Sequence, residues 1–586
     1  MERQVHEFFT PVDWAIIIGY LVLTTIVGHL MRGKQGTIRD FFLGGRSLPW
    51  PAVCGSIIAT EISGVTFIGV AGSLFAMHGN FTYLIWGIGS IIGRVIVAKF
   101  FVPVFYKQEI YSPYDYMGQR LGSPIKALAS IVFTIGSILG QSVRVFVAAI
   151  PLQIVTGLPI WICILLIGMF AIGWTLMGGM RTVIWTDVMQ FFLFTFGGLL
   201  ALFYIVSSLD GGWAEYWTTA TTLGKTKILD LSWGFEAELK FTLWVAILAV
   251  PFQNMTAFGV DQLNAQRMFC CRDSKAASKA LVWSSSGLLL TFLMLMVGAG
   301  LVAHYNQNPF TAQEGRVVMG ITETVDAIAL KQSSEALATA QRIENPKARN
   351  DTGEVVYPEM ISNVPIPKKP DMVFPMWIVT QLPIGLSGLI LAGVFAAAIS
   401  SLDSILAALS QTTLSLLYHP EKLSDKELEK LNLVTKSRWL VIFWGIGLSL
   451  LTLLLVKASQ GIAILPLAFG MTAYAMGPLL GLFFCSLLGK GSVRGLVTGV
   501  VLSFLLVLFI RVDVWVLFIG TWPDLAKILS LLPSYALTSS ISETGIVQHG
   551  IKPVFFFGWA WPVTTFLTVA CGLLIPGKSQ SKTVTT

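Results

Sequence analysis

The sequence predicts an all-α polytopic membrane protein. Of its 586 residues, 54% are hydrophobic and only 12% are charged, whereas a soluble domain carries roughly 25% charged residues. Apolar runs of about 18 residues or more recur along the chain, and such runs cross a bilayer as helices that satisfy their own backbone hydrogen bonds. The net charge of +7 requires no nucleic-acid partner, because membrane proteins gather Lys and Arg in cytoplasmic loops. The lipid bilayer is therefore the expected surrounding.

The hydropathy pattern predicts about thirteen membrane spans. They lie at about 12–31, 48–77, 81–106, 124–155, 159–177, 182–208, 243–264, 280–304, 382–418, 439–456, 462–488, 493–510 and 553–574. Basic residues follow the first, third and seventh spans, which predicts an outside N-terminus and a cytoplasmic C-terminus. The N-terminus lacks a basic region and a cleavage site, so we expect the first span to be retained. We expect the protein in the plasma membrane, which is the inner membrane in a bacterium.

These spans divide into segments around two blocks of five. Residues 1–47 hold an extra N-terminal span and a cytoplasmic loop, and residues 48–208 form the first repeat. An external loop at 209–242 precedes the second repeat, which starts at 243–304, is interrupted by a long external loop at 305–371, and resumes at 372–490. Residues 491–586 hold the last spans and a short cytoplasmic tail, and a helix is expected near 321–342.

One apolar stretch, Gly393–Ser404, carries a strip of polar side chains. On a helix, Ala397, Ser400 and Ser401 share a face, and Asp403 and Ser404 continue it one turn on. Hydroxyl and carboxylate oxygens suit a small hard cation, and ionisable groups inside a membrane are costly and usually functional. The alternative is that the serines cap backbone carbonyls and Asp403 meets a neighbouring cation.

Two spans are interrupted at similar depth, by Ala59–Thr66 in the second span and by Pro251–Gly259 in the seventh. Five spans apart, they occupy corresponding places in the two blocks. Paired interruptions of this kind indicate a transporter with inverted repeats and a binding site at mid-membrane. The alternative is that Gly and Pro only kink well-packed helices.

With further stretches, these features resemble the sodium/solute symporter family (SSS), which has the leucine-transporter-type fold with a five-plus-five inverted repeat. The resemblance covers nearly the whole chain. The stretches that carry it are Phe67–Gly69, Gly178–Gln190, Asn254–Arg267, Ala397–Ser404 and Gly477–Phe483.

The resemblance implies that sodium is the coupling ion and binds between the second and ninth spans. The implied ligands are the carbonyl groups of Ala59, Ile62 and Ala397 and the hydroxyl groups of Ser400 and Ser401.

Asp187 matches a family acidic residue that in some members helps to bind a second sodium ion. We hypothesise a second cation site at Asp187, Asp403 and Ser404, since two neighbouring carboxylates would bind a cation or share a proton. The alternative is a salt bridge from either aspartate to an arginine such as Arg181.

The substrate pattern departs from that of the family's sugar carriers, because Thr66 and Ile85 replace their Gln and Glu. Arg144, deep in the fourth span, suits a carboxylate. We therefore expect import of a small organic anion, such as a sugar acid, sialic acid or monocarboxylate. A neutral sugar or polyol is the alternative. The residues expected at the substrate are Ser63, Thr66, Arg144, Asn254, Phe258 and Glu61.

The charged residues leave several alternatives open. Arg144 would instead pair with Glu61 or extend to the membrane surface, and Glu61 would titrate, bind a cationic substrate or add charge near sodium. Arg94 and Lys99 are expected to reach the cytoplasm.

Two other functional classes, enzyme and membrane sensor, fit the sequence less well. The sequence has no catalytic motif and no metal-spaced Cys/His cluster, so we expect no enzyme, and no obligate protein partner is evident. A transporter-like sensor would need a fused signalling domain, whereas this chain stops soon after its last expected span.

Overall fold

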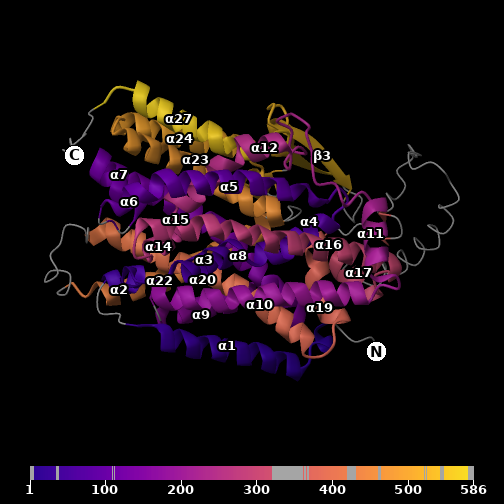
Figure 1. The fold of residues 1–586 in the computed structure, drawn as a ribbon. Coiled ribbons are helices and arrows are strands. Elements are labelled where there is room, and N and C mark those ends of the chain that lie inside the picture. The colour runs from indigo at the N-terminus through magenta and orange to yellow at the C-terminus, as the bar shows by residue number, and fades with distance from the viewer. Residues whose placement is uncertain are drawn as a thin grey trace.

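The computed structural model describes residues 5–33, 38–108, 110, 112–177, 179–319, 360–361, 364–365, 369–418, 431–458, 464–519, 522, 524–541 and 547–577. Long helices lie side by side along one direction, with α1 (Pro11–Met31) on one side of the bundle and α24 (Val493–Ile510) and α27 (Ala560–Leu574) on the other (Figure 1). The expected helix near 321–342 lies outside the described residues.

The remaining helices alternate with single-turn 3-10 or π segments, labelled η. In chain order they are η1 (Val5–Phe8), α2 (Ile38–Leu43), η2 (Gly44–Arg46), α3 (Trp50–Glu61), η3 (Val65–Val70), α4 (Ala71–Phe75), η4 (Phe81–Ile85), α5 (Trp86–Ile96), η5 (Val97–Phe101), α6 (Val102–Tyr106), α7 (Pro113–Leu121), α8 (Ser123–Thr156), α9 (Ile160–Met177), α10 (Met180–Ser207), α11 (Gly212–Thr222), α12 (Leu243–Leu248), α13 (Val250–Met255), η6 (Thr256–Val260), α14 (Gln262–Phe269), α15 (Ser274–Trp283), η7 (Ser284–Gly287), α16 (Leu288–Gln307), α17 (Ala312–Met319), η8 (Pro370–Met372), α19 (Val373–Gln381), α20 (Leu386–Tyr418), α22 (Leu433–Ala458), α23 (Ile464–Leu488), α25 (Asp513–Ile519), α26 (Asp524–Leu529) and η10 (Phe557–Trp559).

Eleven helices of the described chain are long and apolar enough to cross a membrane, or twelve when the bent pair Trp50–Glu61 and Val65–Phe75 counts as one span. A shorter apolar helix, Ile160–Leu176, stands where the fifth span is expected. The predominantly helical membrane architecture is therefore confirmed, while the number thirteen stays a prediction.

Helix α20 lies at the centre of the bundle. It packs against α10, α8, α22 and α1, and Ser400, Ser401, Asp403 and Ser404 are all buried within it. The polar strip therefore faces neighbouring helices and not lipid.

The first predicted interruption is present, and the second lies just beyond its predicted stretch. Helix α3 ends at Glu61, Ile62 is extended (φ −80°, ψ 93°), and the chain continues at η3 with a bend of 57°. The seventh span has a π segment, η6, and then breaks at Asp261, which is extended (φ −69°, ψ 126°). This second break therefore comes just after the predicted stretch Pro251–Gly259.

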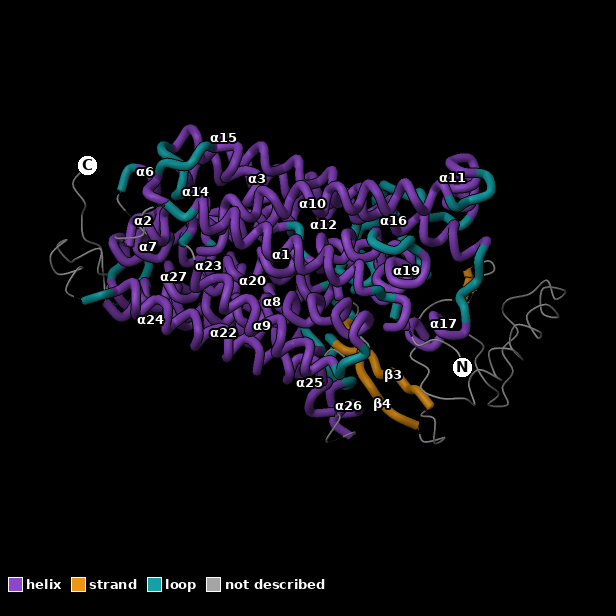
Figure 2. The backbone as a smooth tube through the Cα atoms, turned by 90° about the horizontal axis from the view of Figure 1, so that it is seen from below, coloured by secondary structure: helices purple, strands orange, loops and turns teal. Residues whose placement is uncertain are grey.

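A β-hairpin, β3 (Tyr535–Ile541) with β4 (Val547–Pro553), stands at one end of the bundle near α25 and α26 (Figure 2). We call this the hairpin end. A second antiparallel pair is short, β1 (Met360–Ile361) with β2 (Val364–Pro365). The last span was predicted from residue 553, but residues 547–553 pair as a strand, and the apolar helical run begins at Phe557, just before α27.

Two groups outside the long helices fasten α4 at the hairpin end. The Lys225 ammonium donates hydrogen bonds to the carbonyls of Leu74, Ala76 and Met77 at 3.1, 2.6 and 3.2 Å. On the other side, Asp371 packs against Gly72, where an added Cβ would come within 2.8 Å of the Asp371 Cα. The Asp371 carboxylate also accepts a hydrogen bond from the Ile464 N–H at 2.9 Å, at the start of α23.

We expect Asp371→Asn to stabilise the protein at neutral pH. Burial raises the pKa of Asp371 from 3.8 to about 6, so the folded state holds the proton more tightly than the unfolded state. The stability from this group is complete below pH 3.8 and is lost as the pH rises through 6. The amide keeps an acceptor for Ile464 without the buried charge, which is worth about 1 to 2 kcal/mol at pH 7. Thermal unfolding at pH 5 and pH 7 checks this, with exposed Asp524→Asn as control; a less stable Asp371→Asn protein at pH 7 contradicts it.

Candidate functional site

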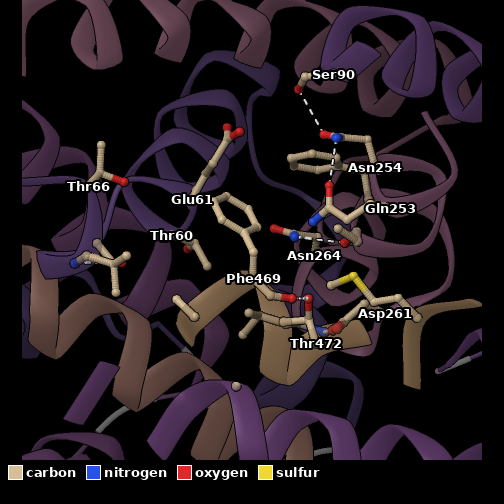
Figure 3. Close-up of a pocket in the computed structure, with 18 of the residues that line it drawn as sticks. Thr60, Glu61, Thr66, Ser90, Gln253, Asn254, Asp261, Asn264, Phe469 and Thr472 are labelled. Atoms are coloured by element: carbon tan, nitrogen blue, oxygen red, sulfur yellow. Dashed lines mark hydrogen bonds between the residues drawn. The ribbon is translucent and has the colours of Figure 1, made fainter. Parts of the chain in front are cut away.

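A cavity of about 190 Å³ lies between the two interrupted spans. Its wall is formed by both breaks together with α5, α8, α16 and α23. Figure 3 shows Thr60, Glu61 and Thr66 on one side of this space and Gln253, Asn254 and Asp261 on the other. The geometry therefore places a polar site where the paired interruptions predict one.

The first break leaves backbone carbonyls without donors. Among the described residues, hydrogen bonds at the break go to the carbonyls of Ile58, Thr60 and Ser63, and none goes to Ala59 or Ile62. These two oxygens also lie at the C-terminal end of α3, where the helix dipole favours a cation. Ala59, Ile62 and Ala397 are buried.

The two serines of α20 face different partners. Ser401 Oγ lies 3.4 Å from the Thr60 carbonyl and 3.2 Å from the Ala397 carbonyl, so it reaches the break. Ser400 Oγ instead donates to Asp187. The structure therefore brings Ser401 to the first break, whereas the Ser400 hydroxyl turns towards α10.

The group expected to hold a second cation contains an arginine. Arg267 on α14 lies 3.1 Å from Asp187 Oδ2, donates to Ser56 Oγ at 2.9 Å, and also donates to Ser404. Asp187 is thus paired with Arg267 and not with Arg181. Asp403 Oδ1 accepts from Ser404 Oγ at 3.0 Å, while Asp403 Oδ2 has no partner among the described residues.

Every residue expected at the substrate lines the cavity: Ser63, Thr66, Arg144, Asn254, Phe258 and Glu61. Asn254 is held by Ser90, whose hydroxyl donates to it at 2.8 Å, and by Val250, whose carbonyl it donates to at 3.1 Å. Tyr83 and Trp86 also line the cavity, beside Phe469 of α23.

The charged residues of the wall are paired differently from the sequence-based alternatives. Arg94 is completely buried and forms an ion pair with Glu61, so the expectation that it reaches the cytoplasm is wrong. Arg144 donates to the Thr60 carbonyl at 3.1 Å, and no described carboxylate lies within ion-pair distance of it. Glu61 is therefore not the partner of Arg144.

Several polar residues of the wall were missed by the sequence analysis, among them Gln253, Asp261, Asn264 and Thr472. Asp261 Oδ1 accepts from the Leu263 N–H at 2.8 Å and caps α14. An Asp-Gln pair ending an apolar run is the signal that marks this break.

Known proteins of one family resemble this chain over most of its length. The sequence model of the sodium:solute symporter family matches residues 41–330 and 355–499. The sodium/sialic acid symporter SiaT of Proteus mirabilis (strain HI4320) is 27% identical over 512 residues, covering 87% of this chain and 91% of that protein. The sodium-coupled monocarboxylate transporter 2 of Bos taurus is 25% identical over 508 residues, covering 85% of this chain and 72% of that protein.

A solved structure has the same fold. It is described as a substrate-bound, outward-open state of a Na⁺-coupled sialic acid symporter, with a TM-score of 0.69 and 23% identity, and the match covers 98% of this chain and 100% of that one. The predicted fold is thereby confirmed. The chain belongs to the sodium:solute symporter family, and sodium is its coupling ion.

Proposed function

We propose that this protein imports a small organic anion, such as a sugar acid, sialic acid or monocarboxylate, together with sodium by alternating access. The proposal depends chiefly on the position of Arg144 in the cavity wall. Its guanidinium lines the cavity and donates to the Thr60 carbonyl, and no described carboxylate pairs with it. A guanidinium has five N–H donors, so most remain for a carboxylate. Similarity to sialic acid and monocarboxylate symporters supports the same substrate class.

The sodium site is proposed at the carbonyls of Ala59, Ile62 and Ala397 with the hydroxyls of Ser400 and Ser401. The free carbonyls at the break and the position of Ser401 support it. Sodium would hold the break against α20, and this shapes the neighbouring cavity for the substrate. Coupling is then the reciprocal effect of each ligand on the affinity for the other.

The second cation site at Asp187, Asp403 and Ser404 stays a proposal. The free Asp403 Oδ2 supports it, but Arg267 already supplies a positive charge to Asp187 and Ser404. A second cation would therefore require Arg267 to leave Ser404.

We also propose an outside N-terminus and a cytoplasmic C-terminus in the plasma membrane, with the repeats at 48–208 and 243–490. The basic residues used for this prediction lie on or beside α2, α7 and α14. These three helices lie together at the end of the bundle opposite the hairpin end (Figure 1). The hairpin end would then face outside.

A neutral sugar or polyol is the second candidate substrate, because the side-chain amides of Gln253, Asn254 and Asn264 line the cavity and can bind hydroxyl groups. The proposal includes no catalytic activity. Uptake into proteoliposomes of labelled carboxylates and neutral sugars, with and without an inward sodium gradient, separates the candidates. Accumulation of sugars alone would overturn the anion proposal, and no gradient-driven uptake of either class would favour a sensor.

We expect Arg144→Ala to reduce sodium-driven uptake of a carboxylate by about tenfold to a hundredfold, because it removes the charged donor from the cavity. Arg144→Lys should restore only part of the uptake, since an ammonium cannot bind both carboxylate oxygens in the same way. Arg272→Ala, at an exposed arginine, is the control. Unchanged carboxylate uptake in Arg144→Ala would remove Arg144 from the site.

A further inference from the structure

The ion pair between Glu61 and Arg94 ties four elements together at the cavity wall. Glu61 is the last residue of α3, and Arg94 Nη2 donates to both oxygens of its carboxylate. Arg94 Nη1 donates to Ser284 Oγ at 3.0 Å on η7, and the Arg94 guanidinium lies 4.1 Å from the centre of the Phe258 ring on η6. Arg94 is therefore fixed in one orientation behind the wall.

Only the carboxylate of this pair is presented to the cavity. The Glu61 side chain is 30% exposed and lines the cavity, whereas the Arg94 side chain is 0% exposed and does not. An ionised carboxylate has about four acceptor positions, and Arg94 approaches from one side only. Glu61 thus keeps acceptor positions that face the substrate.

The chemistry of the acceptor restricts what binds beside it. A carboxylate accepts hydrogen bonds and cannot donate, so it favours a substrate group that carries a proton and disfavours a bare hydrocarbon. Arg94 neutralises the charge of Glu61, so the electrostatic potential at this acceptor attracts a cationic substrate only weakly. A neutral hydroxyl group fits this acceptor better than an ammonium.

The Glu61 acceptor and the proposed anion anchor Arg144 line the same cavity. Arg144 donates to the carbonyl of Thr60, and Glu61 is the following residue. A substrate that uses both groups carries a carboxylate and, close to it, a hydroxyl group. Simple alkyl carboxylates satisfy Arg144 but leave the acceptor of Glu61 without a donor.

We infer that Glu61, held by Arg94, is the specificity-determining acceptor that selects hydroxylated carboxylates over plain ones. The inference rests on the proposed anion symport. Arg94 is a positioning residue, because it touches Glu61 and lies behind the wall. Thr66, Ser90 and Asn254 add neutral polar groups to the same cavity.

The experiment compares sodium-driven uptake of gluconate and hexanoate, two carboxylates of equal chain length that differ in hydroxylation. The main variant is Glu61→Met with Arg94→Met. It removes both charges together, because neutralising Glu61 alone would leave the Arg94 charge buried without its partner, whereas an apolar replacement of the whole pair is usually tolerated. Arg511→Gln with Asp513→Asn, at another buried ion pair that does not line the cavity, is the matched control.

Wild-type protein and the control pair should prefer gluconate. In the Met double variant, the ratio of gluconate to hexanoate uptake should fall by about tenfold or more. Arg94→Lys, which keeps the charge but loses the planar fork, should lower the ratio of gluconate to hexanoate uptake part of the way.

The possible outcomes distinguish failure of the Glu61 role from failure of anion symport. A double variant that keeps the wild-type ratio, or a wild-type protein that takes up hexanoate as readily as gluconate, overturns the role of Glu61 and leaves anion symport standing. Wild-type protein that takes up neither acid against a sodium gradient overturns anion symport and this inference with it.

Discussion

Replacing Ser400 and Ser401 together with alanine is expected to raise the sodium concentration for half-maximal uptake by about tenfold or more. Two of the five proposed ligands are lost, and each 1.4 kcal/mol of lost binding energy is worth about a factor of ten. Most of the effect should come from Ser401→Ala, because Ser401 Oγ lies beside the break while Ser400 Oγ donates to Asp187. Sodium titration of substrate uptake by purified protein in liposomes measures it.

The control for this prediction is Ser410→Ala. Ser410 lies on the same helix, is equally buried, and donates to the Leu406 carbonyl at 2.6 Å. It should leave the sodium titration unchanged while reporting the cost of removing a buried hydroxyl group. A double Ser400, Ser401 variant with the sodium response of the control would place the sodium ion elsewhere.

Replacing Arg267 with alanine is expected to cost about 3 to 5 kcal/mol of unfolding free energy. Both members of the ion pair with Asp187 are almost completely buried, with exposures of 1% and 0%, and removing one partner leaves the other charge buried without compensation. Ser56 and Ser404 would also lose their arginine donor. Thermal and denaturant unfolding of the purified protein measures the change.

Combining Arg267→Met with Asp187→Asn should recover most of this stability, because the isolated buried charge is gone. Arg272→Ala, at an exposed arginine, should have little effect. An Arg267→Ala protein as stable as wild type contradicts the prediction. If added sodium rescues the stability of Arg267→Ala, the cation has replaced the guanidinium, which would support the proposed second cation site.

The sequence predicted those parts of the fold that depend on local pattern. Helix lengths follow from the extent of the apolar runs, and α20 and α24 were placed within a few residues. The break at Glu61 was visible because polar residues and a glycine interrupt an apolar span. The β3–β4 hairpin was missed because residues 535–553 mix apolar and polar residues without the length of a span.

The ion pairs were harder to predict because they join residues far apart in the sequence. An arginine deep in a span indicates that an acidic partner lies nearby, but the sequence contains several acidic residues that could be that partner. Arg94 meets Glu61 across 33 residues and Arg267 meets Asp187 across 80 residues. The choice of partner depends on how the helices pack against one another. A hydropathy pattern carries no information on that packing. Asp261 was overlooked for a different reason, since its position at the end of an apolar run resembles an ordinary helix cap.

The attachment of α4 to segments outside the bundle has a consequence for inhibition. Lys225 belongs to the connection between α11 and α12, and Asp371 precedes α19. A tilt of the second half of the broken span therefore either breaks these contacts or carries the connections with it. An antibody fragment that clamps the Lys225 connection would slow turnover while leaving the apparent affinity for the substrate intact. With the proposed orientation, the hairpin end would offer a target for non-competitive blockers that never enter the cavity.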